Sequence, residues 1–248
     1  MKTVPLRFRI RAVSTTLALI LFPIYFYYLS PAIPLMGSAS GILTGSIMLF
    51  VALLLISMVL GRGFCAYVCP VGTIQDMTGR GSPRKFPQKY FSWVKYLIWS
   101  AWLGTLFFLF RRAGGLRSIR FAFGTEYGIS VSDISSLLAF LMVLLVFFFT
   151  SLVFGRRAAC HTLCWIAPFM VLGNKLGRIL HVPSLVIKAS AETACVSCGR
   201  CDEACPMSLE VSSMIKKGCI DSVDCILCGQ CVDVCGRHIP VHSWRHYV

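Results

Sequence analysis

Two runs of closely spaced cysteines constrain the C-terminal part of this chain more than any other feature. The first run is Cys195, Cys198, Cys201 and Cys205, and Pro206 follows it. The second run is Cys225, Cys228, Cys231 and Cys235, and Gly236 follows it. Three thiolates at this spacing can bind three irons of a cubic [4Fe–4S] cluster, but a loop that short cannot reach the fourth iron. The fourth ligand of each cluster must therefore come from elsewhere in the chain.

This spacing is typical of bacterial-type ferredoxins, in which the fourth cysteine of each run binds the other cluster. The pattern assigns cluster 1 to Cys195, Cys198, Cys201 and Cys235. It assigns cluster 2 to Cys205, Cys225, Cys228 and Cys231. Zinc is the alternative, but structural zinc sites use cysteine pairs separated by a long spacer. We therefore expect a compact α+β domain with two [4Fe–4S] clusters over residues 183–248.

The composition of the chain is that of a membrane protein. It is 56% hydrophobic and 14% charged, whereas soluble domains carry about a quarter charged residues. Four apolar stretches are long enough to cross a bilayer, which takes about 20 helical residues. They are Val13–Leu29, Gly41–Leu60, Phe91–Phe110 and Ile134–Phe154. The sequence thus predicts an α-helical membrane domain with four transmembrane helices over residues 1–182, in which Lys95 extends to the membrane interface.

Basic residues predict how these helices are oriented, because they accumulate on the cytoplasmic side. The 31–40 connection has none. The 61–90 connection has five: Arg62, Arg80, Arg84, Lys85 and Lys89. The 111–133 connection has four arginines and conflicts with this pattern. We expect a multi-pass protein of the cytoplasmic (inner) membrane with both termini in the cytoplasm, a retained first helix and no disulfides.

The net charge of +14 concentrates beside the predicted spans and favours contact with anionic membrane lipid. A nucleic-acid partner is not expected, because no recognition motif accompanies the charge.

Two further cysteine pairs follow the second and fourth apolar stretches. They lie in GRGFCAYVCPVG, residues 61–72, and in GRRAACHTLCWIAP, residues 155–168. Both contain Cys-x3-Cys after Gly-Arg, so the chain carries an internal repeat in which Cys65 corresponds to Cys160. Cysteines four residues apart share one helix face. Cys65, Cys69, Cys160 and Cys164 therefore predict a third cluster, a site for another metal or two redox dithiols, unless they are small packing residues.

Through GRGFCAYVCPVG, GRRAACHTLCWIAPF and the two ferredoxin runs, the chain resembles the NapH/MauN-type membrane iron–sulfur proteins, which are related to the NosR- and CcoG-like polyferredoxins. The resemblance implies a helical bundle with Cys-x3-Cys motifs at cytoplasmic helix ends and a two-cluster ferredoxin. It also implies an electron-transfer component of a quinol dehydrogenase system. One motif departs from the family pattern, since Trp165 follows Cys164 where the family has proline.

We therefore predict an iron–sulfur electron-transfer protein that relays electrons between the quinone pool and a partner redox protein or cytochrome subunit. The alternative function is a metal-handling or assembly factor, in which the Cys-x3-Cys pairs bind or reduce a metal such as copper, because soft thiolates select Cu(I). His161, Arg62 and Arg156 are the candidates for binding quinone or moving protons. A packing histidine and arginines that anchor helix ends at lipid phosphates are the alternatives. The sequence identifies no catalytic residue.

Overall fold

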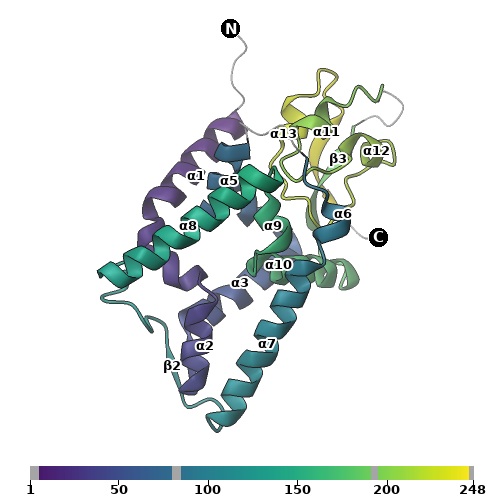
Figure 1. Cartoon of the computed structure of the whole chain (residues 1–248). Coiled ribbons are helices and arrows are strands. Elements are labelled where there is room, and N and C mark those ends of the chain that lie inside the picture. The colour runs from purple at the N-terminus through teal and green to yellow at the C-terminus, as the bar shows by residue number, and fades with distance from the viewer. Residues whose placement is uncertain (1–5, 80–84, 191–194, 246–248) are drawn as a thin grey trace.

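The structure is a computed structural model that describes residues 6–79, 85–190 and 195–245. A helical domain occupies most of it, and a small domain with two strands lies beside the N-terminal end of α1 (Figure 1). The long helices are α1 (Leu6–Tyr25), α3 (Gly45–Leu60), α7 (Val94–Arg112) and α8 (Ile134–Phe154). The shorter ones are η1 (Phe26–Leu29), α2 (Ala32–Ala39), α4 (Phe64–Tyr67), α5 (Pro70–Gly79), α6 (Gln88–Phe91), α9 (Ala158–Thr162) and α10 (Ile166–Ile179).

Each predicted span is helical over most of its length, and α8 has the predicted bounds. Within the described residues, two segments are long and apolar enough to cross a membrane, Leu6–Ala39 and Ile134–Phe154. The apolar helix α3 is shorter. Crossing of the bilayer by all four long helices therefore remains a prediction.

The expectation for Lys95 is wrong. Its side chain is buried and its Nζ lies 2.8 Å from Asp224 Oδ1, a residue of the C-terminal domain. A carboxylate brought in by tertiary folding thus replaces the lipid interface as the partner of this ammonium group.

Two short strands join the connections at the far end of the helical domain. β1 (Ile42–Thr44) pairs in parallel with β2 (Ser118–Arg120). The arginine-rich connection that follows α7 therefore lies beside the uncharged connection that precedes α3, away from the C-terminal domain (Figure 1). The charge conflict seen in the sequence is thus retained in the structure. Arg80 and Arg84 of the predicted basic connection lie outside the described residues.

The internal repeat is present as two similar sets of helices, α3–α4–α5 and α8–α9–α10. Each set exchanges its last helix: α10 packs along α3, and α5 packs along α8. Glycines permit the closer of these contacts. A Cβ atom added to Gly173 would overlap Ser57 Oγ and the Leu54 carbonyl, and one added to Gly177 would lie 2.6 Å from the Met58 carbonyl oxygen. The two halves of the repeat are therefore interlocked by direct backbone approach.

This approach predicts that Gly173→Ala lowers the free energy of unfolding, by about 1–3 kcal/mol, because α10 must move away from α3. Gly104→Ala is the matched control, since no atom lies within 4 Å of a Cβ at that position of α7. The control should be neutral or stabilising, because alanine favours a helix over glycine by about 1 kcal/mol. Thermal unfolding in detergent measures both, and equal effects would contradict the close packing of α10.

The C-terminal domain begins with β3 (Ser184–Ala189), which pairs antiparallel with β4 (Pro240–Arg245). Three short helices lie between these strands: α11 (Arg200–Ala204), α12 (Val211–Ile215) and α13 (Gln230–Asp233). α11 and α13 each start inside a cysteine run, after Gly199 and Gly229, which both have positive φ angles. Non-glycine residues rarely adopt this conformation. The glycines therefore let each ligand loop turn directly into a helix.

Candidate functional site: three cysteine-lined cavities

Two cavities in the C-terminal domain are lined by the two predicted ligand sets. One is lined by Cys195, Cys198, Cys201 and Cys235. The other is lined by Cys205, Cys225, Cys228 and Cys231. The structure thus brings the fourth cysteine of each run to the other run's loop, as the sequence predicts. The two runs lie side by side because α11, which starts inside the first run, packs against α13, which starts inside the second.

The two cavities differ in exposure. Cys198 is exposed, and it lines the first cavity together with the exposed Arg200. In the second cavity Cys205, Cys228 and Cys231 are buried. Burial raises the pKa of Cys225 to about 12 and that of Cys205 to about 11. These thiols would stay protonated at neutral pH without a metal, because only a bound metal stabilises the thiolates in such surroundings.

The two Cys-x3-Cys motifs meet inside the helical domain. Cys65, Cys69, Cys160 and Cys164 line one cavity, whose other walls include Phe22 and Phe147. Phe147 belongs to the interior of α8, about 10 Å from its C-terminal end at 1.5 Å per residue. Cys65, Cys69 and Cys160 are buried and Cys164 is partly buried, so this site lies inside the domain. The exchange of α5 and α10 between the repeats is what carries the motifs together.

The donor set of each cavity fits an iron–sulfur cluster. Each has four cysteine sulfurs, the usual ligands of a [4Fe–4S] cube. Within the described residues, no three His, Cys, Asp or Glu side chains lie close enough to share a single metal ion. Thiols spread around a cavity suit a cluster of several irons better than one ion. When bound, such a cluster would supply one-electron transfer.

Two buried side chains contact the thiols of the helical domain. Gln75 donates from Nε2 to Cys160 Sγ at 3.2 Å and accepts from the Ala159 N–H at 3.1 Å. Met170 places its Sδ 3.6 Å from Cys65 Sγ. Both residues have no exposed surface. Gln75 and Met170 therefore each contact one thiol of this cavity, and the sequence did not point to either residue.

The counterpart of Arg62 in the second repeat is Arg157. Each stands three residues before the first cysteine of its motif, and both are buried. Arg157 donates from Nη1 to the Cys65 carbonyl at 3.0 Å, across the repeat boundary. Arg156, which the sequence paired with Arg62, is partly exposed and donates to the Glu203 carbonyl of the C-terminal domain. One extra residue between glycine and cysteine in the second motif explains the shift.

Two aspartates hold these arginines. Asp76 accepts from Arg157 Nε and Nη2 at 2.6 and 2.7 Å and also binds Arg11. Asp224 binds Arg62 Nη1 at 2.6 Å and Lys95 at 2.8 Å. Burial by itself would raise the pKa of Asp224, but the two cations outweigh it and lower the pKa to about 2. Both carboxylates are therefore ionised at neutral pH.

Sequence reasoning missed both aspartates. The only signal it offered was their rarity, since the chain has ten acidic residues in all.

His161 is buried and stacks on Phe86, with ring centroids 5.2 Å apart. Burial lowers its pKa to about 3, and the nearby Lys95 and Arg62 add to the effect. The imidazole is therefore neutral. Cys219, outside both runs, lines none of the three cavities, and its Sγ lies 3.4 Å from Arg245 Nη2.

Comparisons with known families agree with this arrangement. The model of a 4Fe-4S binding domain matches twice, over residues 42–89 and 136–183, and each match contains one Cys-x3-Cys motif. The model of a 4Fe-4S dicluster domain matches residues 194–239, which contain both cysteine runs. No solved structure matches the chain.

Two curated relatives match most of the chain. "Putative electron transport protein YccM" of Escherichia coli strain K12 is 27% identical over 210 residues, or 76% of this chain. "Methylamine utilization ferredoxin-type protein MauN" of Paracoccus denitrificans strain Pd 1222 is 30% identical over 178 residues, or 68% of this chain. In both comparisons the match spans 55% of the relative's length. The chain belongs to the NapH/MauN-type 4Fe-4S proteins.

Proposed function

We propose that this chain is a membrane-bound relay that carries electrons between the quinone pool and a partner redox protein through three [4Fe–4S] centres. The observation that supports it most is the meeting of Cys65, Cys69, Cys160 and Cys164 around one cavity. The name of the E. coli relative, an electron transport protein, points to the same class of function.

The contacts between the domains suggest the order of the centres. Asp224, which precedes Cys225 of cluster 2, binds Arg62, which stands three residues before Cys65. Cluster 2 would therefore be next to the centre in the helical domain. Cluster 1, with its exposed Cys198, would exchange electrons with the partner. The full path would be helical-domain centre, cluster 2, cluster 1 and partner, with the helical domain in the cytoplasmic membrane and the clusters of the C-terminal domain in the cytoplasm.

The relay predicts that Cys65→Ala and Cys160→Ala abolish reduction of the C-terminal clusters by a quinol such as decylubiquinol. The same variants should still be reduced by dithionite, because clusters 1 and 2 keep all their ligands. Stopped-flow absorbance under anaerobic conditions measures both reactions. Normal quinol kinetics in the two variants would contradict a relay through the helical domain.

One observation favours the alternative, a metal-handling factor. The thioether of Met170 lies 3.6 Å from Cys65 Sγ, and thiolate with thioether is a donor set that selects Cu(I). Metal analysis of anaerobically purified protein decides between the two functions. Copper bound at the expense of iron, and lost in Cys65→Ala, would favour the metal-handling function.

A further inference from the structure

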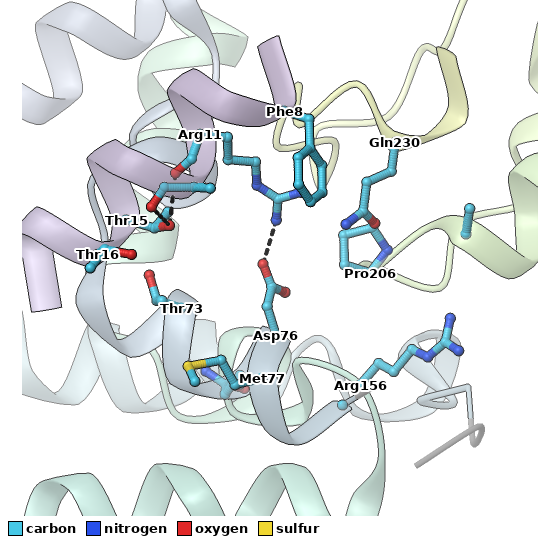
Figure 2. Close-up of a pocket in the computed structure, with 14 residues that line it drawn as sticks. Phe8, Arg11, Thr15, Thr16, Thr73, Asp76, Met77, Arg156, Pro206 and Gln230 are labelled. Atoms are coloured by element: carbon cyan, nitrogen blue, oxygen red, sulfur yellow. Dashed lines mark hydrogen bonds and ion pairs between the residues drawn. The ribbon is translucent and has the colours of Figure 1, made fainter. Parts of the chain in front are cut away.

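A pocket of about 360 Å³ lies where the helical domain meets the C-terminal domain. Figure 2 shows Arg11 paired with Asp76 in its wall, with Pro206 and Gln230 of the C-terminal domain on one side and Thr73 on the other. The volume falls within the range of about 300–1,000 Å³ that is usual for small-molecule sites. The pocket is therefore large enough for a ring-sized ligand.

The pocket touches two of the three cysteine cavities. Gln75 belongs to its wall and donates to Cys160 Sγ. Pro206 and Gln230, also in the wall, are the sequence neighbours of Cys205 and Cys231. A ligand in this pocket would thus lie between the four-cysteine site of the helical domain and cluster 2.

The wall carries Arg11, Arg156 and Asp76, so one positive charge is in excess. Arg11 and Asp76 are paired with each other, and Asp76 is also held by Arg157. The hydroxyls of Thr15 and Thr73 donate to backbone carbonyls, which leaves their oxygens able to accept a hydrogen bond. Phe8 and Met77 add apolar surface. Because Asp76 neutralises Arg11, Arg156 is the one lining cation left to balance an anion. The lining therefore suits a neutral molecule with polar oxygens and an apolar ring better than it suits a multiply charged anion.

The pocket opens on the outer surface of α1 and α5. Ala12 and Thr16 line it and are exposed, and Met77 is 62% exposed. α1 belongs to one of the two segments that are long and apolar enough to span a membrane. An amphipathic ligand could therefore enter sideways from the lipid, with its apolar tail still in the bilayer.

We propose that this pocket binds the head group of a quinol. The proposal rests on the proposed function and adds the place where the donor binds. Oxidation of one quinol to quinone releases two electrons and two protons. The four-cysteine site of the helical domain, if it holds a cluster, would take the two electrons one at a time and pass each to cluster 2, and water at the open mouth would accept the protons. Thr73 and Thr15 bind the ring oxygens, and Gln75 separates the ring from the Cys160 thiolate.

The test fills the pocket from its exposed side. Ala12→Trp places a large ring in the mouth, and Val13→Trp is the matched control, because Val13 is an exposed neighbour on α1 that does not line the pocket. Isothermal titration with oxidised decylubiquinone measures binding directly, and stopped-flow reduction by decylubiquinol measures electron entry. We expect Ala12→Trp to weaken both by at least about tenfold, because a clash removes the site. Val13→Trp should behave as the unmodified chain, and dithionite should reduce all three proteins equally.

Three results would overturn the proposal. Unchanged binding and reduction in Ala12→Trp, with the unmodified chain active, would place the quinol elsewhere and leave the relay intact. Absence of quinol binding and reduction in the unmodified chain would overturn the relay and the pocket together. A phospholipid found by native mass spectrometry in the unmodified chain and absent from Ala12→Trp, with quinol reduction unchanged, would make the pocket a lipid site.

Discussion

Anaerobically purified protein should contain about twelve irons and twelve sulfides per chain, and Cys65→Ala or Cys160→Ala should reduce both to about eight. The reason is that each variant removes one thiolate from the single cavity that joins the two Cys-x3-Cys motifs. The C-terminal clusters should be unaffected, because their eight ligands lie in other cavities. Iron and sulfide analysis, together with EPR spectra recorded during a redox titration, measures this effect.

Cys219→Ala is the control for this experiment. Cys219 is a partly buried thiol that lines none of the three cavities, so its loss should leave the iron content unchanged. About eight irons in the unmodified chain would mean that the four thiols of the helical domain are dithiols or hold another metal. An iron content in Cys65→Ala and Cys160→Ala equal to that of the unmodified chain would lead to the same conclusion.

Asp76→Asn should lower the free energy of unfolding by about 3–5 kcal/mol, because it leaves buried guanidinium groups without their counter-charge. The side chains of Arg157 and Arg11 are only 1% and 10% exposed, so water cannot replace the lost carboxylate. Asp76 also joins the two repeats, since it belongs to α5 while Arg157 precedes α9. Thermal unfolding of detergent-solubilised protein, followed by circular dichroism, measures the loss.

Asp221→Asn is the matched control for the charge change. Asp221 also contacts two arginines, Arg178 and Arg245, but its side chain is 60% exposed. Exposed ion pairs contribute about 0–1 kcal/mol, so this variant should unfold almost as the unmodified chain does. Combining Asp76→Asn with Arg157→Met should recover part of the lost stability, because one of the unpaired charges is removed. Equal losses of unfolding free energy in Asp76→Asn and Asp221→Asn would contradict the view that burial makes the ion pairs of Asp76 important for stability.

Features that depend on local spacing could be predicted from the sequence alone. Cysteine spacing within each run predicts which thiols can share one cube, and the structure brings together Cys205 and Cys235 with the opposite runs as that spacing requires. Hydrophobic length predicts where the long helices lie, and α8 has the predicted bounds. The repeat was also visible, because the residues around Cys65 and Cys160 are similar, and the family comparison matches each copy. Each of these signals depends on residues that are close together in the sequence, so it can be recognised without knowledge of the fold.

Tertiary structure alone decided which distant groups meet. The sequence left open whether the two Cys-x3-Cys motifs form one shared site or two separate dithiols, whereas the exchange of α5 and α10 joins their four thiols around one cavity. The sequence paired Arg62 with Arg156. In the structure the buried counterpart of Arg62 is Arg157, whose guanidinium group binds Asp76 of the other repeat. The sequence assigned Lys95 to the lipid interface, yet Asp224 lies within 2.8 Å of its ammonium group. The physical reason is the same in each case: a buried charge or thiol is stabilised by whichever partner the fold brings within contact distance, and that partner is encoded nowhere near it in the sequence.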